Sequence, residues 1–173
     1  VGRPFLPFAD GAPTPSGKVE LVSESMARQG LPALPTYMPL VEGPEHTEIA
    51  RRYPLQCIVP PNRFFLNSSF AESPRLRRRQ GAPAVFLHPA DAGVRGIGEG
   101  DAVVVHTARG ESRFTAHLTE DTRAGVIVIE GIWWAKHQAG GRNVNALTDD
   151  RVADMGGGPV FHSNLAEVTR LVA

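Results

Sequence analysis

Residues 84–105 read AVFLHPADAGVRGIGEGDAVVV, and this stretch decides the fold class. Its two apolar runs, Ala84–Leu87 and Ala102–Val105, are short and predict buried strands. Between them, Pro89 favours the first position of a short helix, and Gly96 favours the left-handed conformation that ends one. The stretch therefore predicts a strand, a short helix, a tight turn and a second strand.

The flanking sequence continues this pattern of short strands. Further strands are predicted on either side, with a hairpin turn at Ala108–Gly110: Leu55–Val59, Glu111–Leu118 and Val126–Ile129. The chain would then hold about six or seven short strands, without long helices alternating between them. We therefore expect a mainly β fold, and a small closed barrel fits best because it leaves few exposed strand edges.

Residues 1–52 differ from the rest of the chain. Lys18–Val22 alternates in polarity and predicts a short strand, and Ser23 is a candidate N-cap for a short helix. Four prolines then indicate an extended connector: Pro32, Pro35, Pro39 and Pro44. We expect residues 1–52 to be an extended connector from a preceding domain and residues 53–173 to form the barrel.

The composition limits the kinds of binding partner and site that we expect for this chain. Lys and Arg together number 18, as do Asp and Glu, so a net charge of zero gives no electrostatic reason to expect nucleic acid. The single cysteine, Cys57, can form neither an internal disulfide nor a CxxC metal site. No apolar stretch reaches the roughly 18 residues of a membrane span. The basic cluster Arg75–Arg79 fits a solvated helix face.

No catalytic or metal-ligating pattern stands out. Ser68, Ser69 and Ser163 lack a Gly-x-Ser-x-Gly elbow, so local hydrogen bonding is the favoured role. The histidines lack metal-site spacing, although His106 and His117 lie on strands that could pair and so leave a metal site between strands open. We expect neither catalytic residues nor metal ligands in this chain.

Two polar clusters are candidates for binding a ligand. The first, Pro60–Ser69, follows the first core strand and offers amides, a hydroxyl and a cation: Asn62, Arg63, Asn67 and Ser68. The second lies in the irregular segment 143–164, which includes three consecutive glycines, Gly156–Gly158, whose ordering is entropically unfavourable. Its candidates are Asn145, Phe161 and His162. Together the clusters predict a pocket for a flat, polar, phosphorylated ligand, although turn geometry alone could explain single asparagines.

The chain resembles a known family in an ordered set of motifs: Tyr53-Pro-Leu55, Asn67-Ser-Ser-Phe70, His88-Pro-Ala-Asp91, Arg95-Gly-Ile-Gly-Glu-Gly-Asp101, Trp133-Trp134, Asn143–Thr148 and Gly157–His162. This set is similar to the molybdopterin dinucleotide-binding domain that closes the catalytic chain of dimethyl sulfoxide reductase-family enzymes. The resemblance implies a six-stranded double-psi β-barrel. It also implies a pterin-guanine dinucleotide cofactor carrying molybdenum or tungsten.

The resemblance assigns roles to both clusters. Pro60–Ser69 would contact the pterin and pyrophosphate, with Arg63 suited to the pyrophosphate, and Asn145–His162 would supply amide and aromatic contacts. One departure is Val59-Pro-Pro61, where relatives often carry Thr-Pro-Arg. The metal's protein ligand and any iron–sulfur cluster would lie outside this chain, so the isolated chain is expected to be inactive.

The same resemblance suggests partners. They are the remaining domains of the catalytic chain and an iron–sulfur electron-transfer subunit, with no nucleic acid and no direct membrane span. The chain begins at Val1 without an initiator Met, which suggests the end of a larger protein. Cytoplasmic and exported locations both remain open.

Two alternatives remain. A non-catalytic double-psi barrel, serving as an adaptor or substrate-binding module, would also fit His88-Pro-Ala-Asp91 and Gly100-Asp101. Such a module has no need of the Asn145–His162 segment, which separates it from a cofactor domain. A free-standing small subunit with the same barrel is the other alternative.

Overall fold

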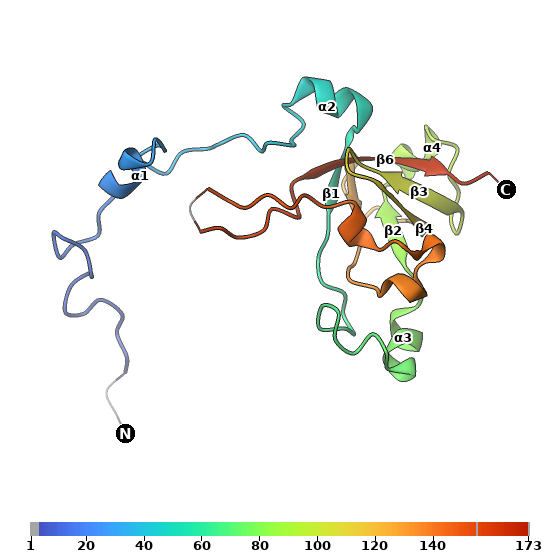
Figure 1. Cartoon of the computed structure of the whole chain (residues 1–173), viewed down its shortest axis with the longest axis horizontal. Helices are drawn as coiled ribbons and strands as arrows, with labels where there is room; N and C mark the ends of the chain where they lie inside the picture. The colour runs from blue at the N-terminus through green and yellow to red at the C-terminus, as the bar shows by residue number, and fades with distance from the viewer. Residues whose placement is uncertain (1–3, 155, 173) are drawn as a thin grey trace. The chain divides into compact units, whose positions relative to one another are not determined.

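The computed structural model describes residues 4–154 and 156–172, which form two units divided between Met38 and Pro39. In the first unit, helix α1 (Glu24–Arg28) is capped by Ser23, whose Oγ accepts a hydrogen bond from the Met26 N–H at 3.3 Å. The predicted capped helix is therefore confirmed (Figure 1, blue). The predicted domain boundary between residues 52 and 53 stays a prediction.

The predicted strand at Lys18–Val22 is wrong. These residues take no strand conformation, and their apolar side chains are largely exposed, with Val19 at 78% and Leu21 at 74%. A strand needs a pairing partner for its backbone groups, and alternation in sequence does not supply one.

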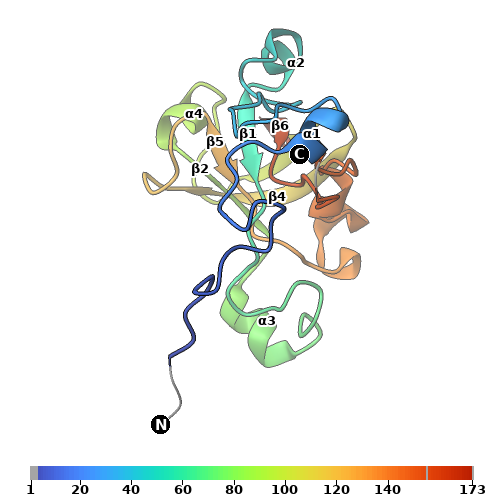
Figure 2. The ribbon, with the colours of Figure 1, turned by 90° about the vertical axis from the view of Figure 1, so that its left-hand side faces the viewer.

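The second unit is a closed barrel of six strands in the order β1-β5-β2-β4-β3-β6. Figures 1 and 2 show the strands wrapped round one centre, with the short helices outside them. The strands are β1 (Leu55–Ile58), β2 (Ala84–Leu87), β3 (Ala102–His106), β4 (Glu111–Leu118), β5 (Val126–Val128) and β6 (Asn164–Arg170). The predicted mainly β, six-stranded barrel is confirmed.

The barrel contains both parallel and antiparallel strand pairs, and their directions fix where the connecting loops emerge. The pairs β1–β5 and β2–β4 are parallel, and the other four pairs are antiparallel. Because β1 and β5 run in the same direction, their carboxyl ends open at the same edge of the barrel. The segments that follow them are therefore neighbours.

The barrel interior is filled by apolar side chains from all six strands. Alternation on β4 buries Ser112, Phe114 and Ala116 and exposes the residues between them. Fully buried residues include Leu87 on β2 and also Leu147, which comes from the irregular segment. Burying a side chain of this size stabilises the fold by about 1.5–3 kcal/mol.

The barrel unit also contains several short helices. Helices α3 (Pro74–Gln80) and α4 (Pro89–Gly93) both begin at proline, in α4 as the sequence predicts, and α3 has no buried residues. Helix α2 (Thr47–Arg52) lies where the sequence predicts only an extended connector. Three 3-10 turns follow β5 and were not predicted: η1 (Ala135–His137), η2 (Ala139–Gly141) and η3 (Val144–Ala146).

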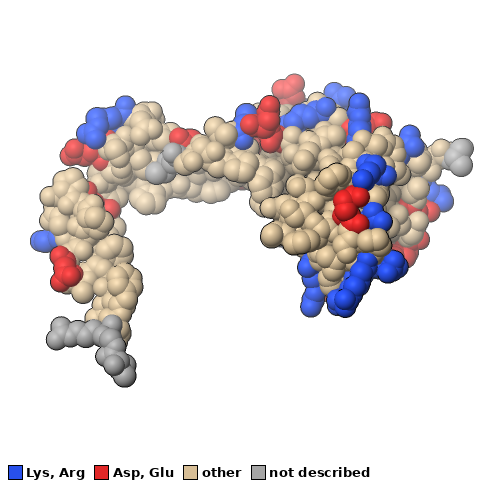
Figure 3. Space-filling view, turned by 60° about the horizontal axis from the view of Figure 1, so that its bottom comes forward, with Lys and Arg blue, Asp and Glu red and all other residues tan. Residues whose placement is uncertain are grey.

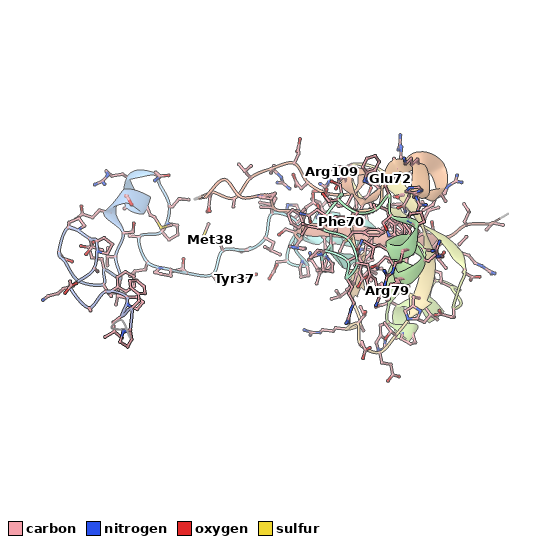
Figure 4. The ribbon with its side chains drawn as sticks, turned by 90° about the horizontal axis from the view of Figure 1, so that it is seen from below. Tyr37, Met38, Phe70, Glu72, Arg79 and Arg109 are labelled. Carbon is pink, nitrogen blue, oxygen red and sulfur yellow. The ribbon has the colours of Figure 1, made fainter. Side chains whose placement is uncertain are left out.

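The charged surface is uneven. Arg75, Arg78 and Arg79 of α3 are exposed, and Figure 3 shows basic side chains gathered along one edge of the barrel unit. Arg79, labelled in Figure 4, lies over the Phe64 ring at 4.6 Å. None of the helices in the described residues has both the length and the apolar character that a bilayer-crossing helix requires.

Candidate functional site

A cavity of about 440 Å³ lies where the segments after β1 and β5 meet the irregular segment. This volume is in the range of small-molecule binding sites. Its walls come from three parts of the chain: Val59–Pro61 with Asn67, then Gly131 and Ile132, and finally Asn145, Thr148, Asp149, Pro159, Phe161 and His162. The two polar clusters that the sequence singles out therefore face one cavity.

The parallel pair β1–β5 explains why these segments meet. The pairing continues past both strands: Asn62 N–H donates to the Gly131 carbonyl at 3.0 Å, and Gly131 N–H donates to the Pro60 carbonyl at 3.0 Å. Residue 131 has no room for a side chain, because a Cβ there would lie 2.9 Å from Val144 Cγ1. Glycine thus lets η3 approach the floor of the cavity closely.

Four of the predicted binding residues line this cavity together: Asn67, Asn145, Phe161 and His162. Asn67 adopts a left-handed conformation with φ of 52°, which asparagine tolerates better than most residues. Ser68 lines a neighbouring cavity of about 310 Å³, which shares Asn145 and Ile132 with the first. Asn145 is exposed and lines the cavity, so its side-chain amide is accessible to a ligand.

The other two predicted residues lie differently. Asn62 is buried, and its Oδ1 accepts a hydrogen bond from the Phe65 N–H at 2.7 Å, which shapes the loop. Among the described residues, its Nδ2 is a buried polar atom without a hydrogen-bond partner. Arg63 is exposed and lines neither cavity. The structure therefore does not bring Arg63 together with the other candidates.

The ring of His162 has a fixed hydrogen-bonding role. Its Nδ1 accepts a hydrogen bond from the Val59 N–H at 3.2 Å, so this nitrogen carries no proton. In the neutral imidazole the proton then sits on Nε2, which makes that nitrogen a donor. His162 therefore presents an N–H group at the cavity wall.

A metal site between strands finds no support. His106 Nε2 lies 2.8 Å from Thr169 Oγ1, and His117 Nδ1 lies 2.8 Å from Glu99 Oε1. In the part of the chain that the structure describes, three or more His, Cys, Asp or Glu side chains nowhere gather as metal ligands.

The sequence did not reveal a buried charged network beside the cavity. Glu42, Arg109 and Asp149 lie close together, with Arg109 Nη1 at 2.6 Å from Glu42 Oε1 and 3.6 Å from Asp149 Oδ2. The side chains of Glu42 and Asp149 are only 6% and 4% exposed. Arg151 Nε donates to Asp149 Oδ2 at 2.6 Å, so two cations balance two carboxylates. No local signal joins positions so far apart in the chain.

The network lowers the pKa of both carboxylic acids. Hydrogen bonding to Arg151 lowers the pKa of Asp149 from 3.8 to about 2. Hydrogen bonding to Arg109 lowers the pKa of Glu42 below its usual range. Both groups are therefore ionised at neutral pH.

We expect the network to make the fold sensitive to acid. A carboxyl group with a lowered pKa stabilises the fold above its unfolded pKa, and that stabilisation is lost as pH falls towards the folded pKa. For Asp149 the loss should occur between about pH 4 and about pH 2. Asp149→Asn should be less stable than wild type at pH 7 and should lose less stability across this window, as measured by urea unfolding.

The charge-matched control is Asp150→Asn, which removes an exposed carboxylate next to the network and should leave the network intact. An identical decline of stability with acid in wild type and Asp149→Asn would contradict the expectation.

Comparison with known proteins agrees with this architecture. Residues 55–165 match the family model described as "Molydopterin dinucleotide binding domain". The probable oxidoreductase YoaE of Bacillus subtilis is 41% identical over 164 residues, covering 95% of this chain and 23% of that protein. Dimethyl sulfoxide reductase DmsA of Escherichia coli is 30% identical over 181 residues, covering 95% of this chain and 22% of that protein.

A solved structure shares the fold. Acetylene hydratase from Pelobacter acetylenicus superposes with a TM-score of 0.81 at 24% identity, covering 96% of this chain and 25% of that one. The chain thus spans about a quarter of the length of the relatives it matches. Since the family model covers most of the chain, from the first barrel strand into the last, the protein belongs to the molybdopterin dinucleotide-binding domain family.

Proposed function

We propose that this chain is the cofactor-binding domain of a molybdopterin oxidoreductase catalytic chain, and that its cavity holds part of a pterin-guanine dinucleotide. The observation that carries the proposal is the convergence of two distant polar clusters, at Asn67 and at Asn145–His162, on one cavity. Such convergence is what a ligand site requires and what isolated turns do not explain.

The residues present fit a flat heterocyclic group. Ile132 and Phe161 offer apolar surface, while Asn67, Asn145 and His162 offer polar groups for the edges of a ring. The buried, unpartnered Nδ2 of Asn62 lies in the loop that carries part of the wall. Asp149 also lines the cavity, but its carboxylate is already paired with Arg151.

This chain's part in the reaction would be to bind and orient the cofactor. When bound, the cofactor would supply a molybdenum or tungsten centre for two-electron redox or oxygen-atom transfer. His162 would donate a hydrogen bond from Nε2 to the cofactor. The side chains of Asn67, Asn145 and Ser68 would hydrogen-bond to polar edges of the cofactor. Asn62 would support the loop, and Arg63 would reach a phosphate only from outside the two cavities.

Other parts of the catalytic chain would supply the groups that this domain lacks. The metal's protein ligand would come from other domains of the catalytic chain, for which residues 1–52 would be the connector. An iron–sulfur electron-transfer subunit is the proposed partner. The non-catalytic adaptor module has no supporting observation among the comparisons.

Asn145→Ala in the full-length enzyme tests the cofactor assignment. Asn145 is exposed in the chain alone, and loss of an amide partner that the bound cofactor would bury weakens binding by about 1–3 kcal/mol, or roughly 5- to 150-fold. Metal and pterin per polypeptide should both fall in the purified variant, measured by elemental analysis and by fluorescence of the oxidised pterin. The control is Glu120→Ala, an exposed site between β4 and β5. Wild-type metal and pterin contents in Asn145→Ala would rule out this site.

A further inference from the structure

Arg109 connects separate parts of the barrel unit through all three guanidinium nitrogens. Nη1 and Nη2 donate to the two carboxylate oxygens of Glu42 at 2.6 and 2.9 Å. Nη2 also donates to Asn164 Oδ1 at 2.9 Å, and Nε donates to the Leu147 carbonyl at 3.2 Å. The hairpin turn between β3 and β4 is thereby tied to both ends of the segment 147–164, which carries one wall of the cavity. Figure 4 labels Arg109 within the barrel unit.

Asn164 extends this connection to the cavity wall itself. Asn164 is fully buried, and its Oδ1 accepts a second hydrogen bond, from the Asp149 N–H at 2.8 Å. Its Nδ2 donates to the Phe161 carbonyl at 2.6 Å. Asp149 and Phe161 both line the cavity, so one buried amide links Arg109 to two points on the wall.

The hairpin turn also packs against η3, which immediately precedes the segment 147–164. A Cβ on Gly110 would lie 3.0 Å from the Ala146 carbonyl oxygen, so the turn backbone packs against η3. Asn145, at the centre of η3, lines both cavities. The hairpin turn therefore contacts the wall segment at its first residue, Leu147, and at its last, Asn164, through Arg109, while Gly110 packs against the residue before it.

Apart from the ion pair of Arg151 Nη2 with Glu42 Oε1 at 3.6 Å, the described residues in the middle of the wall have few anchors to the barrel. Val152 pairs with Pro159, and Ala153 N–H donates to the Gly158 carbonyl at 2.8 Å, so this part bonds mainly to itself. Figure 1 shows this part of the chain running away from the barrel and back again, before β6. His162 adds two ties, by accepting from the Val59 N–H on its ring and from Gln56 Nε2 on its carbonyl. Order in this segment must therefore come mostly from its ends.

We propose that Arg109 is a positioning residue that holds residues 147–164 in the conformation that binds the cofactor. The proposal rests on the function proposed above. Arg109 acts through Asn164 and the Leu147 carbonyl. It is not itself one of the residues that line the 440 Å³ cavity. A lysine would keep the charge but could not reach Glu42, Leu147 and Asn164 at once, because it lacks the planar fork of donors.

Hydrogen exchange of the cofactor-free, full-length enzyme tests this role without relying on activity. In Arg109→Lys, amides of residues 148–154 and 156–163 should exchange at least roughly tenfold faster than in wild type, while those of β2 and β5 should not change. Metal and pterin content should fall in the same variant. Glu42→Gln, which removes a charge but little volume, should change both measurements in the same direction and by less. Arg123→Lys, at an exposed arginine, is the matched control.

Each outcome decides the proposal. Unchanged exchange in the wall segment overturns it, as does a uniform acceleration that includes β2 and β5, since that would mean a purely structural role. A loosened wall with wild-type cofactor content also overturns it, provided that Asn145→Ala lowers that content. If Asn145→Ala leaves the content at the wild-type level too, the cofactor assignment of the cavity has failed, and the positioning role fails with it.

Discussion

Leu147→Ala is expected to lower the free energy of unfolding of the chain by about 2–5 kcal/mol. Leu147 is fully buried and belongs to the same apolar cluster as the barrel strands, although it comes from the irregular segment. Truncation removes its contacts and leaves a cavity that the closed barrel can fill only in part. Urea unfolding followed by circular dichroism measures the loss.

The same substitution should also weaken cofactor retention. The Leu147 carbonyl accepts from Arg109 Nε, and Thr148, the next residue, lines the cavity. A matched control is Leu66→Ala, because Leu66 is 67% exposed and its truncation should change stability by about 0.5 kcal/mol or less. Equal losses in the two variants would show that Leu147 is not part of the core.

The strands could be predicted because their signals are local. Ala84–Leu87 and Glu111–Leu118 occupy the predicted positions, the first as a short apolar run and the second as an alternating one. Lys18–Val22 carries a similar alternation but finds no partner strand. Pattern alone therefore identifies which residues can form a strand, whereas pairing across the sheet decides which of them do.

The site was predictable only in part. Asparagine and histidine in irregular segments indicated Asn67, Asn145 and His162, and the structure gathers them because two parallel strands end at one edge. Arg63 was chosen on charge, and charge does not specify direction. Glu42, Arg109 and Asn164 were missed because their hydrogen bonds join positions 55 and 67 residues apart, too distant for any sequence period to show.

The two sides of the cavity are held in place in different ways. Strand ends at Val59–Pro61 and Gly131 form a rigid side of the cavity, joined by backbone hydrogen bonds. The opposite side is a long irregular segment that Arg109 and Asn164 fasten at its ends. A site of this kind would keep precise geometry on one side and permit adjustment on the other when the ligand enters.

Gly131→Ala should destabilise the chain by about 1–3 kcal/mol, because the rigid side of the cavity has no room for one more methyl group. The new Cβ would lie 2.9 Å from Val144 Cγ1 and 3.2 Å from Val59 Cγ1. Both valines are buried and stiff about χ1, so neither can turn away without disturbing the core. Because Gly131 and Val59 line the cavity, metal and pterin content of the full-length enzyme should fall as well.

Gly93→Ala is the matched control for this crowding. Gly93 ends α4, and a Cβ there would meet no heavy atom within 4 Å. Alanine at such a helical position should leave stability unchanged or raise it by up to about 1 kcal/mol. If Gly131→Ala unfolds at the same urea concentration as Gly93→Ala, then Val59 and Val144 do not close over residue 131. In that case the close approach of η3 to the strand ends would not be what forms the floor of the cavity.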